Sequence, residues 1–120
     1  MYVIISGCRQ YDNYDEAKDF IDSIISRHFS RERLTVISGH CRGSDLLGER
    51  YAEENALECI LFPAEWALYG RKAGPIRNEK MASLADALIC FWDGTSRGTR
   101  SMISCAERKG IPVFVKRIDR

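Results

Sequence analysis

The sequence predicts an α/β protein with a Rossmann-like, three-layer fold, in which a five-stranded parallel sheet of order 3-2-1-4-5 is flanked by helices. Three observations lead to this prediction. Five short apolar runs alternate with four stretches of helical periodicity, as in successive βαβ units. Glycine-rich turns follow several of the apolar runs. The 120 residues suffice for one core, so a single domain is expected over residues 1–120.

The first half of the chain contains two strands with a helix between them. The apolar, β-branched runs 2–6 and 34–37 suit strands that are covered on both faces. Asn13 is placed to cap the intervening helix, and Glu16 follows at the spacing of a capping box. The apolar stripe of that helix ends at His28, which is interpreted as a packing or helix-terminal residue.

The region around residue 40 predicts a strand, a glycine turn and the start of a second helix, at about 44–55. Ser44 or Asp45 is expected to cap that helix through its side chain. A third strand at 57–62 ends at a proline, and residues 64–73 read as a long connection that carries aromatic and basic side chains.

The second half of the chain continues the alternation. A helix is predicted to begin at Gly74-Pro75, which puts Arg77 and Asn78 in its first turn. The continuous apolar run 87–92 is the fourth strand, and a helix over 99–109 follows and ends at a glycine. Residues 112–115 complete the sheet.

The composition is that of an ordinary soluble globular protein. The formal net charge is +1, so no overall field draws the chain to nucleic acid or to a membrane surface. The five cysteines are odd in number and show no C-x-x-C spacing, which argues against a disulfide framework and a zinc site. We therefore expect reduced thiols, a cytoplasmic location, no metal and no membrane span.

The predicted strand order reverses next to the first strand, and ligands bind beyond the strand ends at such a point. Glycine turns and helix N-termini present free N–H groups to phosphate there, and arginines add donors. The short glycine motifs match neither G-x-G-x-x-G nor the P-loop pattern. The predicted ligand-binding residues are Gly7, Arg9, Ser38, Gly39, Arg42, Gly43, Ser44, Asp45, Trp66, Arg77, Asn78, Asp93, Gly94, Ser96, Arg97, Gly98 and Thr99.

Two glutamates are weak candidates for catalysis. Glu49 lies two residues beyond Leu47, so it points away from the core, and a solvated side chain is slightly favoured over one that turns back to the loop. Glu79 lies in the third predicted helix, the one that begins at Gly74-Pro75. His40 lies in the glycine turn, but one histidine without an evident partner is weak evidence for acid–base chemistry.

Several motifs together resemble a known superfamily. The run Ser38-Gly39-His40-Cys41-Arg42-Gly43-Ser44-Asp45 is similar to the SGGARGAD signature of the SLOG (Smf/DprA and LOG-like) Rossmannoid proteins. The YspA-related branch, found in bacteria and phages, is the most similar. Further marks are Gly7-Cys8-Arg9, Pro63-Ala64-Glu65-Trp66, Gly74 through Met81, Ala85 through Ile89, and Trp92 through Thr99.

The resemblance implies a nucleotide or nucleotide-derived ligand, and it leaves three functions open. The first is a domain that only binds such a small phosphorylated ligand, signalling through self-association or a partner. The second is a LOG-like N-glycoside hydrolase or transferase acting on nucleoside monophosphates. Met102, however, stands where the LOG motif has its glutamate, and a methionine cannot transfer a proton.

The third is DprA-like binding of single-stranded DNA, because Arg77-Asn78 resembles a motif of that group. The near-neutral charge counts against nucleic acid as a partner, since such affinity comes largely from cations.

Overall fold

The structure is a computed structural model that describes residues 1–119. Strands and helices alternate along the chain, as the apolar runs predict. Their bounds are β1 Tyr2–Gly7, α1 Tyr14–His28, β2 Thr35–Ser38, α2 Ser44–Glu54, β3 Glu58–Leu61, α3 Trp66–Tyr69, a 3₁₀ turn Gly70–Lys72, α4 Ala73–Leu84, β4 Ala87–Trp92, α5 Arg97–Lys109 and β5 Val113–Arg117.

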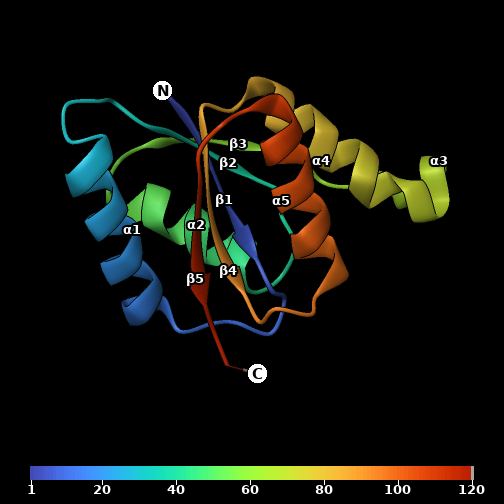
Figure 1. Cartoon of the computed structure of the whole chain (residues 1–120), viewed down its shortest axis with the longest axis horizontal. Coiled ribbons are helices and arrows are strands. Elements are labelled where there is room, and N and C mark those ends of the chain that lie inside the picture. The colour runs from blue at the N-terminus through green and yellow to red at the C-terminus, as the bar shows by residue number, and fades with distance from the viewer. Residues whose placement is uncertain (120) are drawn as a thin grey trace.

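The five strands form one sheet of order β3-β2-β1-β4-β5, and every pairing is parallel. The register around the central strand sets Val3 opposite Val36 on β2 and opposite Ala87 on β4. Figure 1 shows α1 and α2 on one side of this sheet and α4 and α5 on the other. The predicted three-layer fold and strand order are therefore confirmed.

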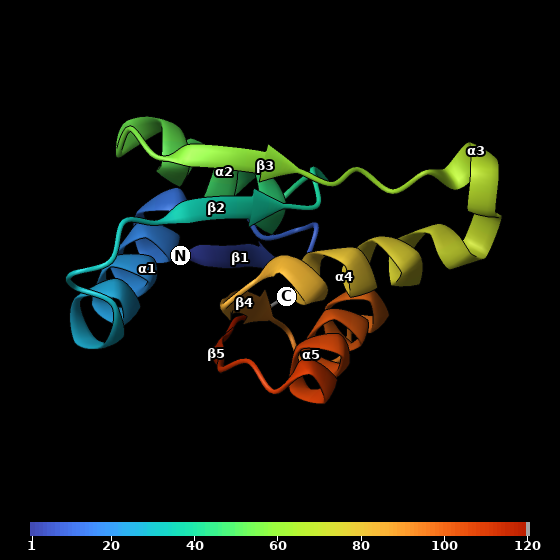
Figure 2. The same ribbon diagram turned by 90° about the horizontal axis from the view of Figure 1, so that it is seen from above.

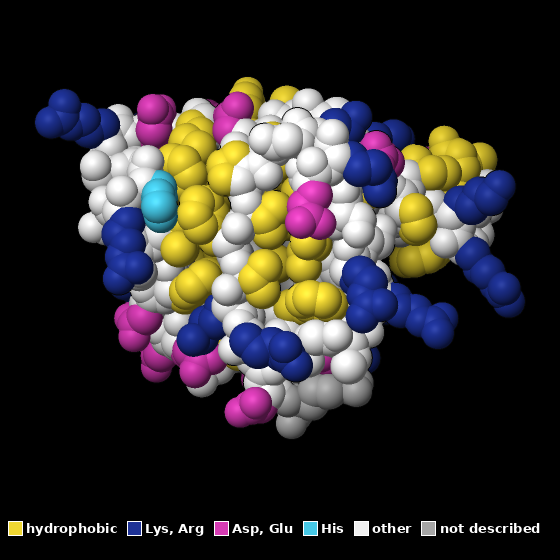
Figure 3. All heavy atoms as spheres, viewed as in Figure 1, with side chains coloured by type: hydrophobic (Ala, Val, Ile, Leu, Met, Phe, Trp, Pro, Cys, Tyr) yellow, Lys and Arg dark blue, Asp and Glu magenta, His cyan; other side chains and the backbone are white. Residues whose placement is uncertain are grey.

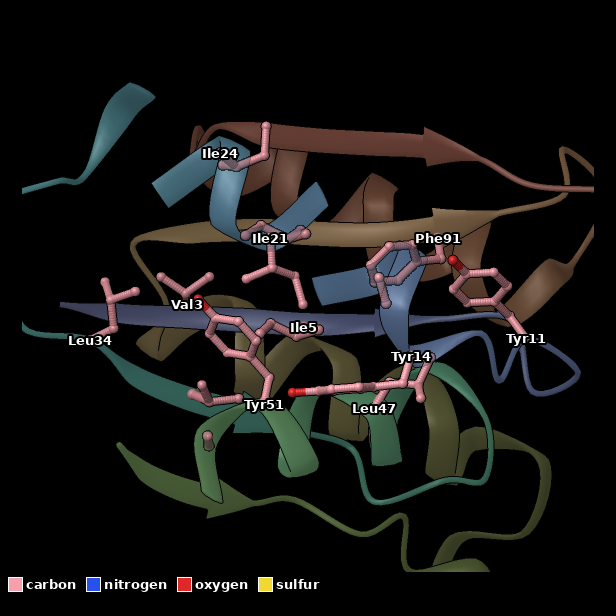
Figure 4. Packing of buried hydrophobic residues seen from close by; sticks show 14 of the residues in the cluster. Val3, Ile5, Tyr11, Tyr14, Ile21, Ile24, Leu34, Leu47, Tyr51 and Phe91 are labelled. Carbon is pink, nitrogen blue, oxygen red and sulfur yellow. The ribbon is translucent and has the colours of Figure 1, made fainter. Parts of the chain in front are cut away.

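Alternate residues of the strands enter two separate cores, because successive side chains point to opposite faces of a sheet. Val3 and Ile5 pack under α1 and α2, where Phe91 and Tyr11 stack with ring centroids 5.0 Å apart (Figure 4). Ile4 faces the other side and joins the core under α4 and α5. Burial on both faces explains why β1 and β4 read as continuous apolar runs.

Several predicted details of the elements need correction. Neither Ser44 nor Asp45 caps α2, since no side-chain hydrogen bond caps that helix and Gly43 is its N-cap residue. The connection predicted over 64–73 contains the short helix α3 and the 3₁₀ turn. Because α4 already begins at Ala73, Arg77 and Asn78 lie in its second turn and not in its first.

The segment around α3 stands away from the rest of the molecule. Figure 2 shows α3 at the far end of the long connection between β3 and α4. No residue of α3 is buried. No described helix is both long and apolar enough to span a bilayer.

Candidate functional site

A cavity of about 310 Å³ opens at the carboxyl ends of β1 and β4, where the strand order reverses. The β1–α1 loop, the β2–α2 turn, α4 and the start of α5 all contribute to its walls. The structure thus brings four separate segments of the chain to one place. The predicted site residues that line it are Gly7, Arg9, Arg42, Asp45, Arg77, Asn78, Ser96, Arg97, Gly98 and Thr99.

The β2–α2 turn is bound tightly to the β1–α1 loop. Both the backbone N–H and the hydroxyl of Ser44 donate to the carbonyl of Cys8, at 3.2 and 2.8 Å. The backbone N–H of Cys8 in turn donates to the carbonyl of Phe91 on β4, at 2.9 Å. Gly43 has φ +78, and a Cβ there would lie 2.3 Å from the carbonyl oxygen of Arg9. This part of the cavity wall is therefore a rigid clamp between two loops.

Asp45 is the carboxylate that lies against the cavity. It is only 5% exposed, and its Oδ2 accepts the backbone N–H of Cys41 at 3.1 Å. Burial raises the pKa of Asp45 to about 6, although the Cys41 hydrogen bond and the positive charge of Arg77 act in the opposite direction. Near neutral pH this group is consequently close to the point where it gains or loses a proton.

Arg77 is held in place by two hydrogen bonds to oxygen and by a longer one, of 3.8 Å, from its Nη1 to Sγ of Cys41. Its Nη1 donates to the carbonyl of Gly39 at 2.9 Å, and its Nε donates to Oδ1 of Asn78 at 2.8 Å. A Cβ on Gly39 would lie 2.5 Å from Nη1, so a glycine is needed for this close approach. Asn78 is itself anchored by a bond of 3.2 Å from its Nδ2 to the Ser101 hydroxyl. Arg77 thus crosses from α4 to the end of β2 in a fixed position.

Three other arginines reach the cavity without a hydrogen-bond or ion-pair partner among the described residues. Arg9, Arg42 and Arg97 are exposed residues that line it. Within residues 1–119, none of these guanidinium groups makes a hydrogen bond or an ion pair. Their charges are therefore available to an anion.

The β4–α5 turn supplies backbone donors. Asp93 shapes this turn, because its Oδ1 accepts the N–H groups of Thr95 and Ser96 at 2.9 and 2.8 Å. Helix α5 then begins without a side-chain cap, and Gly98 and Thr99 of its first turn line the cavity. The first N–H groups of a helix have no partner within it, so they can receive an anion.

The comparisons with known proteins agree with this architecture. The model of the "YspA, cpYpsA-related SLOG family" matches residues 1–69, which is more than half of the chain. This chain belongs to that family. A protein described as "Gene 61 protein" of Mycobacterium phage D29 is 33% identical over 118 residues, and the match covers 93% of each chain. The matched residues include both turns that form the clamp, and the resemblance seen in the sequence is confirmed.

Both candidate catalytic glutamates lie outside the cavity lining of this family member. Oε2 of Glu49 accepts the Ser38 hydroxyl at 2.7 Å and bonds Nδ1 of His40 at 2.8 Å, so the expected solvated glutamate is wrong. The Ser38 hydroxyl also accepts the backbone N–H of His40, whose φ is +58. Together these residues close a small network at the end of β2.

Glu79 lies on the outer surface between α4 and α5. It binds Arg108 and accepts a bond from the thiol of Cys105 at 3.2 Å, with Lys109 nearby at 3.8 Å. The hydrogen bond from Arg108 holds the pKa of Glu79 below its ordinary value. These contacts are those of a surface ion-pair cluster.

The remaining predicted ligand-binding residues do not line the cavity. Ser38, Gly39, Gly43 and Ser44 lie behind its wall and hold the two turns together. Asp93 acts within its own turn, and Gly94 packs against the guanidinium of Arg117. Trp66, a predicted ligand-binding residue, lies on α3 and is 50% exposed.

Six residues line the cavity that sequence reasoning did not select. Cys8, Gln10 and Cys41 are chain neighbours of selected residues, so the motif windows could have included them. Met81 and Met102 had been interpreted as core, since an apolar side chain at helical spacing carries no signal for a ligand. The full set is Ser6, Cys8, Gln10, Cys41, Met81 and Met102. No group of three or more metal-ligating side chains occurs among residues 1–119.

Proposed function

We propose that this domain binds a nucleotide or nucleotide-derived ligand, with a phosphate group in the cavity beside β1 and β4. One observation carries the proposal: Arg9, Arg42 and Arg97 converge on one cavity and have no partner within residues 1–119. Three neighbouring cations repel one another, and Asp45 is the one carboxyl group among the described residues that line the cavity, so a phosphate would relieve the remaining repulsion. Membership of a SLOG family also favours a nucleotide-related ligand.

The backbone around the arginines supports the same ligand. The uncapped start of α5 adds N–H donors and a partial positive charge on the side of Gly98 and Thr99. The Ser6 hydroxyl also lines the cavity, and it is buried without a hydrogen-bond partner within residues 1–119. A buried hydroxyl without a partner costs about 1–3 kcal/mol, so a polar group at the base of the cavity would be favoured.

Thermal unfolding in the presence of candidate ligands tests the proposal. Nucleoside mono- and triphosphates, cyclic nucleotides, NAD-derived compounds and inorganic phosphate are compared. A compound present at about 100 times its Kd should stabilise the fold by about 2.7 kcal/mol. Arg42→Ala and Arg97→Ala should each weaken its binding by roughly 1.5–3 kcal/mol while the unliganded stability changes little, because these side chains lose no native contact.

Arg31→Ala is the matched control. It removes an exposed arginine from the connection between α1 and β2, which lies at the opposite end of the parallel strands. It should leave ligand binding unchanged. The proposal fails if no phosphorylated compound stabilises the protein at millimolar concentration. It also fails if all three alanine variants bind equally well.

Asp45 gives one observation in favour of a second function, the hydrolysis of an N-glycosidic bond. It is the carboxyl residue on the cavity, and its pKa of about 6 suits an acid–base catalyst near neutral pH. In that reaction Asp45, and not Glu49 or Glu79, would accept the proton of the attacking water while the water oxygen bonds C1′ of the sugar. The C1′–N bond would break, and the base would leave with that electron pair and take up the proton. Chromatography of nucleoside monophosphates incubated with the protein and with Asp45→Asn would detect a released base. If the nucleotides are unchanged in both samples, hydrolysis is excluded and ligand binding remains as the proposed function.

A further inference from the structure

A second cavity lies next to the arginine-lined one and has a different chemistry. Its volume is about 300 Å³, and it lies between the end of β3, the α3 segment and α4. Its walls are mainly apolar and aromatic, with Phe62, Pro63, Tyr69 and Ile76 among them. The first cavity instead carries four arginines. Two adjoining hollows therefore offer a cationic surface and an apolar surface.

The chain itself leaves this apolar surface uncovered. Leu61 is 46% exposed and Tyr69 is 39% exposed, and both line the second cavity. Figure 3 shows hydrophobic side chains gathered on the projecting α3 segment, together with basic ones. A single exposed apolar residue is ordinary, whereas an aromatic residue beside a hollow is typical of a ligand site.

Arg77 joins the two cavities, because it lines both of them. Its Nη1 and Nε are occupied by Gly39 and Asn78, so the guanidinium is held as a fixed plane at the boundary. Its Nη2 makes no hydrogen bond within residues 1–119. A ligand with its phosphate in the first cavity would extend over the Arg77 side chain to reach the second cavity. Nη2 of Arg77 could then donate a hydrogen bond to that ligand.

We infer that the second cavity binds the base of the ligand, so that the ligand is a complete nucleoside phosphate and not a phosphosugar or a free phosphate. This inference rests on the proposed function, which supplies the phosphate position. Tyr69 and Phe62 provide the aromatic surface against which a planar base packs. Glu65 and Lys80 at the same cavity offer an acceptor and a donor for the polar edge of a base.

Binding measurements that separate base from phosphate test the inference. A purine and a pyrimidine nucleoside 5′-monophosphate are titrated by calorimetry, alongside ribose 5-phosphate, which has the phosphate and the sugar but no base. The nucleotides should bind more tightly than ribose 5-phosphate. Tyr69→Ala should lower nucleotide affinity by about tenfold, the usual effect of losing one stacked aromatic ring. It should leave ribose 5-phosphate affinity unchanged, and Tyr69→Phe should retain nucleotide binding.

Leu68→Ala is the matched control for Tyr69→Ala. Leu68 is on the same helix and is 66% exposed, but it does not line the cavity, so its loss should change neither affinity. Arg97→Ala should weaken both ligands together, since both carry the phosphate. Thermal unfolding of each variant without ligand checks that the fold is intact.

Four results would overturn the inference. If ribose 5-phosphate binds as tightly as the nucleotides, or if Tyr69→Ala binds nucleotides like the wild type, the base lies elsewhere and the proposed function stands. If Tyr69→Ala weakens binding only where light scattering shows a changed oligomeric state, this surface is a contact between copies of the chain. If no phosphorylated probe binds at all, the proposed function fails as well.

Discussion

The two glycine turns beside the cavity, β2–α2 and β4–α5, differ in how many of their polar groups already form hydrogen bonds within the protein. In the β2–α2 turn, Ser44 is committed to Cys8, Asp45 to Cys41, and Ser38 to Glu49. In the β4–α5 turn, Asp93 binds the N–H groups of Thr95 and Ser96. No described residue accepts the first N–H groups of α5, whereas the first N–H group of α2, that of Ser44, donates to the Cys8 carbonyl. Similar sequence signatures therefore serve different purposes: the first turn mainly holds loops together, and the second leaves donors for a ligand.

The arginines next to the two turns do not differ in this way, because both are available to a ligand. Arg42 belongs to the β2–α2 turn, whose polar groups are already paired, and Arg97 follows the β4–α5 turn, which leaves N–H groups free. Both arginines are nevertheless exposed and have no partner within residues 1–119. A long side chain can reach the cavity from either turn, whereas a backbone N–H can serve a ligand only where the turn has not already used it. Apart from Arg42, we therefore expect substitutions in the β2–α2 turn to act mainly on stability, and those at the start of α5 mainly on binding.

The largest expected effect distinguishes Gly43 of the β2–α2 turn from Gly98 in the first turn of α5. Gly43→Ala should destabilise the fold by roughly 3 kcal/mol or more, because φ is +78 and the new methyl group would meet the Arg9 carbonyl at 2.3 Å. Gly98→Ala should be neutral or stabilise by up to about 1 kcal/mol, since nothing lies within 4 Å of its Cβ position and it is in a helix. Urea denaturation of both variants measures the difference, and equal losses would contradict the distinction between the turns.

The next effect concerns the charge on Asp45. Its folded-state pKa of about 6 lies above the ordinary value of 3.8, so the folded protein binds the proton more tightly than the unfolded chain. This group is therefore expected to cost stability progressively as the pH rises from about 4 to above 6, by about 3 kcal/mol at most.

Asp45→Asn removes this titration, and the amide oxygen can still accept the N–H of Cys41. The variant should gain stability relative to the wild type between pH 4 and pH 7. Chemical denaturation of both proteins across this pH range gives the difference between their free energies of unfolding. The contributions of the other titrating groups largely cancel in this difference. A difference that does not change with pH would show that Asp45 titrates at its ordinary pKa.

A smaller effect on the free energy of unfolding is expected when the two glutamates, Glu49 and Glu79, are replaced. Glu49→Ala should destabilise by about 1–2 kcal/mol, because it removes the partner of His40 and the nearer acceptor of the fully buried Ser38 hydroxyl, leaving it only the Asp45 carbonyl at 3.3 Å. Glu79→Ala should cost less than about 1 kcal/mol, since its contacts with Arg108 and Lys109 are exposed to solvent. Thermal unfolding of the two variants ranks them, and a larger loss for Glu79 would reverse the assignment.

Local sequence patterns were sufficient to predict the fold and much of the cavity. Buried parallel strands need continuous apolar runs, and both faces of β1 and β4 are indeed covered. The strand order then brings the carboxyl ends of β1, β2 and β4 together, which is why Arg9, Arg42 and Arg97 could be named in advance. Asn13 as the cap of α1 followed from spacing alone, and its side chain accepts the N–H of Glu16 at 3.2 Å.

Errors arose where a residue had more than one possible partner. Ser44 suits a helix cap by sequence, but the folded chain presents the Cys8 carbonyl at 2.8 Å, so its hydroxyl donates there. Glu49 was slightly favoured as solvated because its partners, Ser38 and His40, lie about ten positions earlier and meet it only after the β2–α2 turn has formed. Trp66 lies on α3 and lines neither cavity, so its role in binding a ligand stays a prediction.

The sequence by itself determined the alternation of strands and helices, the family, and which arginines lie at the strand ends, because these depend on local periodicity and on short motifs. Only the tertiary structure decided which polar groups are already paired and which remain available. Pairing depends on distances between segments far apart in the chain, such as Cys8 with Ser44 or Gly39 with Arg77. Tertiary packing also placed the aromatic cavity of Tyr69 beside the arginine-lined one, with Arg77 at their boundary.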